Sequence, residues 1–288
     1  MITFTFNSIS RVQWLPEILR GQAIETCAPD KTVQLVFQNI HINDFEPFHF
    51  VLLACLIDKL KKQGYMFVKI DDENHFIYPF LIKTLKIEEY FGAHPKNYVV
   101  SSIENIFNLW RVNDAEKDMV SIMVGDYLKQ NFFKNKDLTA VKESLVEIFY
   151  NIFDHAGANG NAFSFIQYNQ EKEKLYVAVC DFGIGIAKSI RNYFPEIDND
   201  GDAIAKAIED NITVKSQPHN MGMGLGNIIS AISENDSLRI FSNQGMLYVT
   251  GGRKRTFLYN YNFAGTLIYY EMSLSHFPEL EINSTFEL

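Results

Sequence analysis

The 288-residue sequence contains only three cysteines, Cys27, Cys55 and Cys180, which are far apart and form no Cys-x-x-Cys pair. This spacing excludes a disulfide framework and a cysteine-based zinc site, and it favours a reducing compartment. Glycine and proline together number 24 (16 Gly and 8 Pro), too few for a collagen-like or low-complexity chain. We therefore expect a globular, cytoplasmic protein that folds without covalent cross-links.

Long hydrophobic runs and an excess of positive charge are also missing. The longest apolar run, 51–57, ends at Asp58 and Lys59, well short of the ~20 residues of a membrane span, and no basic segment opens the sequence. We therefore expect no secretory signal and no membrane association. The net charge of −9 (26 basic and 35 acidic residues) disfavours nucleic acid as a partner. The basic run 253–255 is typical of a solvated hairpin loop.

Strand-like and helix-like patterns alternate through the first part of the sequence. Period-2 alternation predicts a strand over 32–37, and helical spacing of apolar residues, stopped by Gly64, predicts a helix over 48–62. A second strand is expected over 65–70 and a further helix over 76–85. This order implies an α/β unit with a parallel pair of strands and a crossover helix.

A second α/β unit is expected after the polar, Gly- and Pro-containing stretch between Gly92 and Lys117. Its predicted elements are helices over 116–133 and 138–155 and strands over 162–167, 175–180, 238–241 and 266–272. A long irregular segment precedes a glycine cluster, and such loops are usually functional. We expect two domains, 1–105 and 106–288, the second being a two-layer α/β sandwich.

The predicted helix over 138–155 carries polar residues beside its apolar stripe. Glu147, Asn151 and His155 are four residues apart, which places them on one helix face. A carboxylate, an amide oxygen and an imidazole on one face could orient a water, ligate Mg²⁺ and contact an anion. The alternative is the solvated face of an ordinary amphipathic helix.

The predicted strand over 175–180 runs directly into Asp181-Phe182-Gly183-Ile184-Gly185-Ile186. Glycines after a strand let the backbone turn sharply and approach a ligand closely. An acid at the end of the strand can accept a hydrogen bond from an amino group such as that of adenine. The alternative is an ordinary turn with a surface aspartate.

A glycine cluster formed by Gly222, Gly224 and Gly226 precedes another predicted helix. Backbone amides at a helix start can bind phosphate. The cluster is not a Rossmann fingerprint, because that motif would require glycine in place of Asn227, and the chain has no Gly-Lys-Ser/Thr ending of a P-loop.

The order of these motifs is more specific than any one of them. Glu-x-x-x-Asn-x-x-x-His, Asp-x-Gly-x-Gly-Ile, Gly-x-Gly-Leu-Gly and Gly265-Thr266 follow one another within about 114–273. This order resembles the GHKL superfamily of ATP-binding proteins, and in detail its histidine-kinase-like and anti-sigma-factor-kinase branch. The resemblance implies a Bergerat-type ATP-binding fold for 106–288, with ATP and Mg²⁺ as cofactors.

The resemblance also implies roles for individual residues. Glu147 is expected to act as general base or to position water for γ-phosphate chemistry, and Asn151 to ligate Mg²⁺. Asp181 is expected to recognise the adenine amino group with support from Thr266. The other nucleotide-binding residues expected are His155, Gly183, Gly185, Ile186, Lys215, Gly222, Gly224, Leu225 and Gly226. Lys215 is equally consistent with a solvated loop lysine.

One residue departs from the family pattern. Asp154 stands where many histidine kinases have a Lys or Arg that contacts the phosphates. An acid there repels phosphate unless Mg²⁺ or a hydrogen bond compensates. No helical hairpin that presents a phosphoacceptor histidine is recognisable either. These departures argue against histidine-kinase-like catalysis more than against nucleotide binding.

The N-terminal part, 32–91, resembles STAS-like domains, the interaction modules seen with anti-sigma kinases. The similarity lies in the strand–loop–helix pattern around 36–40 and in the strand at 64–68. Where that family often has a phosphorylatable serine, this chain has Asp44 and Glu46, acids that a helix N-terminus favours anyway. The resemblance implies a STAS-like or regulatory protein as partner.

These features predict an ATP-binding protein that hydrolyses ATP slowly or uses it as a conformational switch, with a lid between Asn211 and Gly226 that a partner reads. One alternative is a Ser/Thr protein kinase of the anti-sigma-factor type. Another is a non-catalytic interaction module that binds nucleotide only for stability. The fate of the γ-phosphate, as free phosphate or as phosphoprotein, distinguishes the two enzymes.

Overall fold

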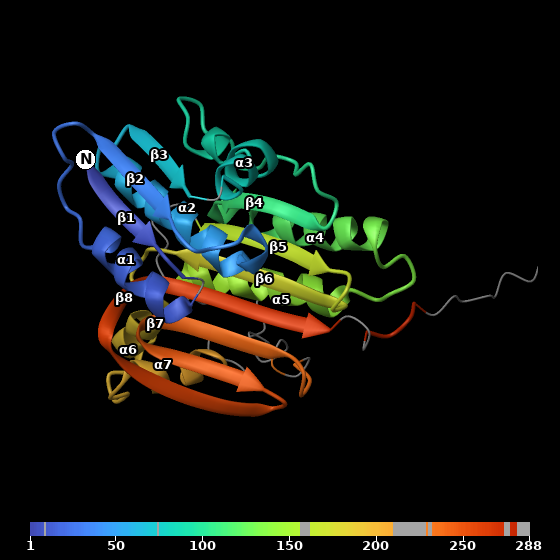
Figure 1. Cartoon of the computed structure of the whole chain (residues 1–288). Coiled ribbons are helices and arrows are strands. Elements are labelled where there is room, and N and C mark those ends of the chain that lie inside the picture. The colour runs from blue at the N-terminus through green and yellow to red at the C-terminus, as the bar shows by residue number, and fades with distance from the viewer. Residues whose placement is uncertain are drawn as a thin grey trace, which may run out of the picture.

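The structure, a computed structural model, describes residues 1–8, 10–73, 75–155, 162–209, 229, 232–273 and 277–280. Within these residues the strands form a three-stranded parallel sheet, in the order β1-β2-β3, and a five-stranded antiparallel sheet, in the order β4-β5-β6-β8-β7. Helices lie between the two sheets and on the far side of the larger one (Figure 1). The expectation of a mixed α/β fold is confirmed.

Strands and helices alternate in the N-terminal part. The elements are β1 (Ile2–Phe6), α1 (Arg11–Gln22), β2 (Thr32–Phe37), η1 (Ile42–Asp44), α2 (Pro47–Lys62) and β3 (Phe67–Asp72). The strand predicted over 32–37, the helix over 48–62 and the parallel crossover are therefore confirmed. Glu46 caps α2, since its side chain accepts from the backbone of His49 while its own N–H donates to His49 Nδ1 at 2.8 Å.

The segment predicted as one helix over 76–85 differs from that expectation. It contains a short turn, α3 (Ile77–Pro79), and a π-helical turn, η2 (Phe80–Thr84), followed by the 3₁₀ turn η3 (Ile87–Tyr90). The N–H of Leu85 donates to the carbonyl of Phe80, five residues earlier, at 2.9 Å. A π-turn accommodates one more residue than an α-turn, and apolar periodicity does not reveal it.

The C-terminal part contains the larger sheet and most of the helices. Its elements are β4 (Ile106–Val112), η4 (Asp114–Glu116), α4 (Lys117–Asn131), α5 (Thr139–Tyr150), η5 (Asn151–His155), β5 (Ala162–Asn169), β6 (Lys174–Asp181), α6 (Ile186–Tyr193), α7 (Asp200–Ala207), β7 (Ser237–Thr250) and β8 (Arg253–Ser273). The predicted helices and strands are confirmed in position, but β7 and β8 are much longer than expected. They form a hairpin closed by Gly251 and Gly252, both at positive φ.

Both faces of the five-stranded sheet are buried over β5, β6 and residues 265–272 of β8. Val177 and Val179 of β6 face the core shared with helices α4 to α7, whereas Ala178 and Cys180 face α2 and the N-terminal sheet. Helix α2 is therefore buried on nearly all sides, as its almost continuous apolar sequence requires. Coverage of both faces explains why β6 has a continuous apolar run over 175–180 and why β5 is apolar on both sides of Ser164. The division at 105/106 runs through this packing and stays a prediction.

Polar contacts also join the two parts of the chain across this interface. The thiol of Cys55 in α2 donates to the carbonyl of Cys180 at 3.3 Å. The guanidinium of Arg111 in β4 pairs with the Asp58 carboxylate of α2 at 3.1 Å, and both side chains are largely shielded from solvent. Tyr269 of β8 donates its hydroxyl hydrogen to Glu46 at 3.1 Å.

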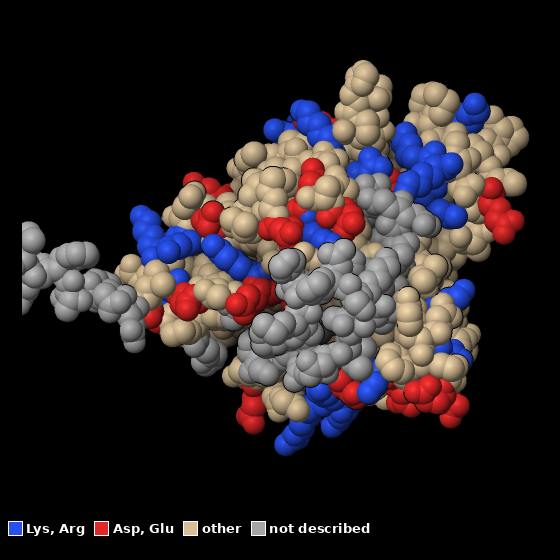
Figure 2. Space-filling view, turned by 180° about the vertical axis from the view of Figure 1, so that it is seen from behind, with Lys and Arg blue, Asp and Glu red and all other residues tan. Residues whose placement is uncertain are grey.

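No helix in the described part of the chain has the length and apolar character needed to cross a bilayer. On the face shown in Figure 2, Lys and Arg side chains form separate groups with Asp and Glu side chains among them. The basic run 253–255 is exposed beside the turn of the β7–β8 hairpin, as expected of a solvated hairpin.

Candidate functional site

The candidate site lies at the carboxyl end of β6. Asp181, the last residue of that strand, is the register partner of Thr266 in β8. Both side chains are fully buried. The N–H of Ile186, at the start of α6, donates to Thr266 Oγ1 at 3.1 Å. The fold therefore brings the Asp-x-Gly-x-Gly-Ile motif and the distant Gly265-Thr266 pair together.

The Asp181 carboxyl group is only partly satisfied. Its Oδ1 accepts from the N–H of Gly183 at 2.6 Å, whereas its Oδ2 is buried without a hydrogen-bond partner in the structure. Burial raises the pKa of Asp181 to about 8, against the lowering effect of the backbone N–H groups of Gly183 and Thr266. A buried acceptor without a partner costs about 1–3 kcal/mol. The interpretation of Asp181 as a surface aspartate in an ordinary turn is therefore wrong.

Two glycines are required beside Asp181 because backbones approach closely there. Gly265 has a φ of +115°, and a Cβ atom on it would lie 2.1 Å from the Asp181 carbonyl oxygen. Gly185 has a φ of +89°, and its Cβ would lie 2.4 Å from Asn243 Oδ1. Glycine at 185 therefore makes room for β7. The expected role of Gly183 and Gly185 in making room for a base stays a prediction.

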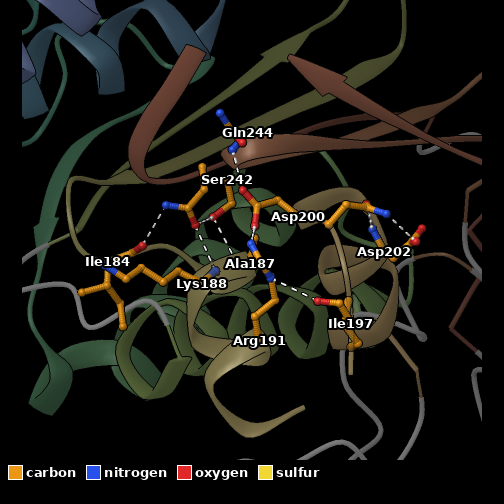
Figure 3. A network of polar contacts seen from close by, with 11 residues as sticks. Ile184, Ala187, Lys188, Arg191, Ile197, Asp200, Asp202, Ser242 and Gln244 are labelled. Atoms are coloured by element: carbon orange, nitrogen blue, oxygen red, sulfur yellow. Dashed lines mark hydrogen bonds and ion pairs between the residues drawn. The ribbon is translucent and has the colours of Figure 1, made fainter. Parts of the chain in front are cut away.

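The first turn of α6 is capped by side chains from the neighbouring strands (Figure 3). The acceptors are Thr266 Oγ1 for the N–H of Ile186 (3.1 Å), Ser242 Oγ for Ala187 (3.3 Å) and Asn243 Oδ1 for Lys188 (3.0 Å). Asn243 also donates to the carbonyl of Ile184 at 3.0 Å. These helix N–H groups are therefore satisfied within the protein and do not offer a phosphate site.

Sequence reasoning missed Ser242 and Asn243. The signal was a Ser-Asn pair directly after the predicted strand over 238–241, a composition typical of caps and turns. Asn243 has a φ of +53°, a left-handed conformation that asparagine tolerates better than most residues. The sequence could not show that this pair caps a helix 55 residues away.

Asp200 fixes the next helix to the same strand (Figure 3). Its buried carboxylate pairs with Arg191 of α6 at 3.1 Å and accepts from the backbone N–H of Gln244 in β7 at 3.0 Å. Helices α6 and α7 are thereby tied to β7. The two helices pack against each other and against β7, next to the turn that follows Asp181.

Glu147 and Asn151 lie at the carboxyl end of α5. Glu147 is half-buried, and burial, with a smaller contribution from Glu143, raises its pKa. Asn151 is buried and donates from Nδ2 to the Glu147 carbonyl at 2.8 Å, so its oxygen is the atom that a cation could take. The interpretation as a solvated helix face is therefore wrong for Asn151. The side chain of His155 lies outside the described residues.

The helix changes from α to π geometry at Asn151, so the face predicted from i, i+4 spacing does not continue unchanged beyond that residue. The π-turn η5 (Asn151–His155) contacts α6, the helix that begins just after Asp181. The structure thus brings the Glu147–Asn151 motif into the same region as the Asp181 turn. π-turns are frequent at functional sites.

The remaining predicted site residues, Lys215, Gly222, Gly224, Leu225 and Gly226, lie outside the described residues. No group of three His, Cys, Asp or Glu side chains in the described part of the chain could hold a metal ion. A cation bound here would therefore need ligands from outside that set of side chains, such as an amide oxygen, water or phosphate.

Among known proteins, no family model and no curated sequence matches this chain.

Proposed function

We propose that residues 106–288 form a Bergerat-type ATP-binding domain, and that the protein hydrolyses ATP slowly or uses it as a conformational switch read by a protein partner. The proposal is supported by the order of the motifs in the sequence and by the juxtaposition of Asp181, Thr266 and the end of α5. The N-terminal part is proposed to be the STAS-like module through which the partner is engaged.

The observation that carries the proposal is the buried Oδ2 of Asp181, which has no hydrogen-bond partner among the described residues. Such an atom fits a ligand that brings a hydrogen-bond donor, because the ligand then removes a desolvation cost the protein already bears. The exocyclic amino group of adenine is a donor of this kind. The Thr266 hydroxyl accepts a hydrogen bond from the N–H of Ile186 and would thereby hold the turn beside Asp181. The geometry that recognises adenine would then be fixed before the base binds.

Mg²⁺ would be held by the oxygen of Asn151. This residue fits the ion, since an amide oxygen is a hard ligand and Nδ2 is already engaged with the Glu147 carbonyl. Mg²⁺ usually keeps several waters and takes its other ligands from substrate phosphates, which agrees with a site that offers few protein ligands. When bound, the ion would supply charge neutralisation for the phosphates.

Glu147 would accept a proton from the attacking water or orient it. Its pKa is raised by burial and by Glu143, which moves the carboxylate toward the range useful to a general base. Phosphoryl transfer depends largely on positioning and electrostatic stabilisation. Few charged groups of the described residues lie at this site, so we expect slow turnover.

The test is ATP binding by calorimetry and ADP production with Mg²⁺ for the native chain, Glu147→Gln and Asp181→Asn. Glu143→Gln is the matched control, since Glu143 is an exposed carboxylate one turn away on the same helix. We expect Glu147→Gln to bind ATP and lose turnover by about 100-fold or more, and Asp181→Asn to lose binding. Glu143→Gln is expected to bind ATP as the native chain does and to retain most of its turnover, because Glu143 makes only the smaller contribution to the raised pKa of Glu147.

The proposal is wrong if the native chain binds no adenine nucleotide, or if Asp181→Asn binds ATP as tightly as the native chain. Binding without turnover would support the interaction module instead. Labelled phosphate that ends on an added protein partner would support the Ser/Thr kinase, and release as free phosphate supports the ATPase.

A further inference from the structure

A cavity lies on the opposite face of the five-stranded sheet from Asp181. It has a volume of about 230 Å³, is partly open to solvent and lies between α1 and α2 on one side and β7 and β8 on the other. Phe241 and Leu267 line it, whereas their chain neighbours Ser242 and Thr266 point to the face that carries the candidate nucleotide site. The nucleotide function proposed above uses none of the residues that line this cavity.

One wall of the cavity is aromatic. The rings of Tyr259 and Tyr261 stack at 5.0 Å, and the ring of Phe241 lies 5.3 Å from Tyr259 and 6.0 Å from Tyr261. The rest of the lining includes Leu15 of α1 and two further aromatic side chains, Phe48 of α2 and Tyr269 of β8. Flat ring faces beside aliphatic groups favour a planar apolar ligand, since aromatic pairs contribute about 0.5–1.5 kcal/mol beyond simple burial.

Among the described residues that line the cavity, Arg239 is the one that carries a charge. Its guanidinium lies 5.1 Å from the ring centroid of Tyr248 and 5.8 Å from that of Tyr269. It donates to Ser237 Oγ at 2.8 Å, and its Nη1 lies 4.0 Å from the Glu271 carboxylate, an ion pair that leaves its other N–H donors for a ligand. The guanidinium plane is therefore held in place by aromatic rings. A guanidinium carries five N–H donors, so it can bind a carboxylate in addition to the partners it has.

We propose that this cavity binds a small aromatic carboxylate, with its rings against Phe241, Tyr259 and Tyr261 and its carboxylate on Arg239. The volume sets the size of the ligand. A cavity of about 150 Å³ holds benzene, so this cavity fits one substituted ring or two fused rings rather than a nucleotide. The site would join the N-terminal part to the β7–β8 hairpin.

The test uses naphthalene-2-carboxylate as the probe and the uncharged naphthalene-2-carboxamide as its matched analogue, with binding to the full-length chain measured by calorimetry. The native chain is expected to bind the carboxylate with a Kd below about 1 mM, the weak range for a ligand of this size. Arg239→Gln is expected to weaken binding of the carboxylate by about tenfold and to change binding of the carboxamide by less than about twofold.

Leu15→Trp, which fills the cavity from the partly buried face of α1, is expected to abolish binding of both probes, whereas Asp181→Asn is expected to bind both normally. Each variant is compared with the native chain by circular dichroism. If Leu15→Trp does not fold, Arg239→Gln still tests whether the carboxylate of the probe binds to Arg239. The proposal is overturned if the native chain does not bind the carboxylate, if Arg239→Gln binds both probes unchanged, or if Asp181→Asn removes binding.

Discussion

Asp181 and Thr266 are register partners on β6 and β8, both fully buried, and each anchors the turn that connects β6 to α6. The Asp181 carboxylate accepts from Gly183 and the Thr266 hydroxyl accepts from Ile186. One carboxylate oxygen is left without a partner in the structure. The Thr266 hydroxyl therefore has a structural role, whereas the second carboxylate oxygen of Asp181 is suited to a ligand. Separate mutations of the two residues distinguish these roles.

Asp181→Asn is expected to stabilise the nucleotide-free protein increasingly as pH rises. The folded-state pKa of Asp181 is about 8, against 3.8 for an unperturbed group, so the folded state retains a proton that the unfolded state has lost. The stability contributed by this carboxyl group is complete at pH below about 4 and is lost as pH rises to about 8. Asparagine does not titrate, so the loss is absent in the variant.

The measurement is urea unfolding of both proteins at pH 5, 6.5 and 8. The free energy of unfolding of Asp181→Asn relative to the native chain should rise by on the order of 1–3 kcal/mol over this range, at ~1.4 kcal/mol per pKa unit before relaxation reduces it. A difference that is constant with pH would mean that Asp181 is not desolvated.

Nucleotide affinity should rise with pH up to about 8 and then level off. Below that value the free site is protonated, because burial has raised the pKa of Asp181, and a donor ligand binds best to the ionised carboxylate. Binding below pH 8 should therefore release up to one proton. Calorimetry with Mg-saturated ATP in two buffers of different ionisation enthalpy measures the release, and proton uptake instead would contradict the assignment.

Thr266→Val should destabilise the protein, because valine keeps the shape of threonine but leaves the buried N–H of Ile186 without its acceptor. The expected cost is about 1–3 kcal/mol in urea unfolding. Thr266→Ser keeps the hydroxyl and serves as the matched control, with an expected cost of ~1 kcal/mol for the lost methyl group. Equal destabilisation of the two variants would show that the cap contributes nothing.

The elements predictable from sequence are those whose apolar pattern is local. β5 and β6 are predictable because both faces of each strand are buried, which gives an uninterrupted apolar run over 175–180 and a run broken only by Ser164 over 162–166. β4 was missed because Asn108 and Arg111 interrupt its pattern. Asn108 is nevertheless buried, since its amide donates to the carbonyls of Leu85 and Val99 from another part of the chain.

The candidate site was predictable in its residue types but not in its environment. Asp181 could be identified from its position after a strand, yet only the pairing of β6 with β8 buries it. Ser242 and Asn243 were missed because they cap a helix that is distant in sequence. The π-turn at Asn151 was also missed, since one inserted residue does not disturb the apolar stripe that predicts the helix.

The segments 1–105 and 106–288 are expected to depend on each other, because one face of the larger sheet is covered by α2. Phe165 is fully buried on that face, with its ring 4.7 Å from that of Phe50 in α2. Segment 106–288 expressed alone should therefore aggregate or bind a hydrophobic dye, and the two segments should co-purify when expressed together. Phe165→Asp should abolish co-purification, whereas Phe257→Asp, on the exposed hairpin, should not. If 106–288 alone is a monomer that binds no dye, it is an independent domain and this face tolerates solvent.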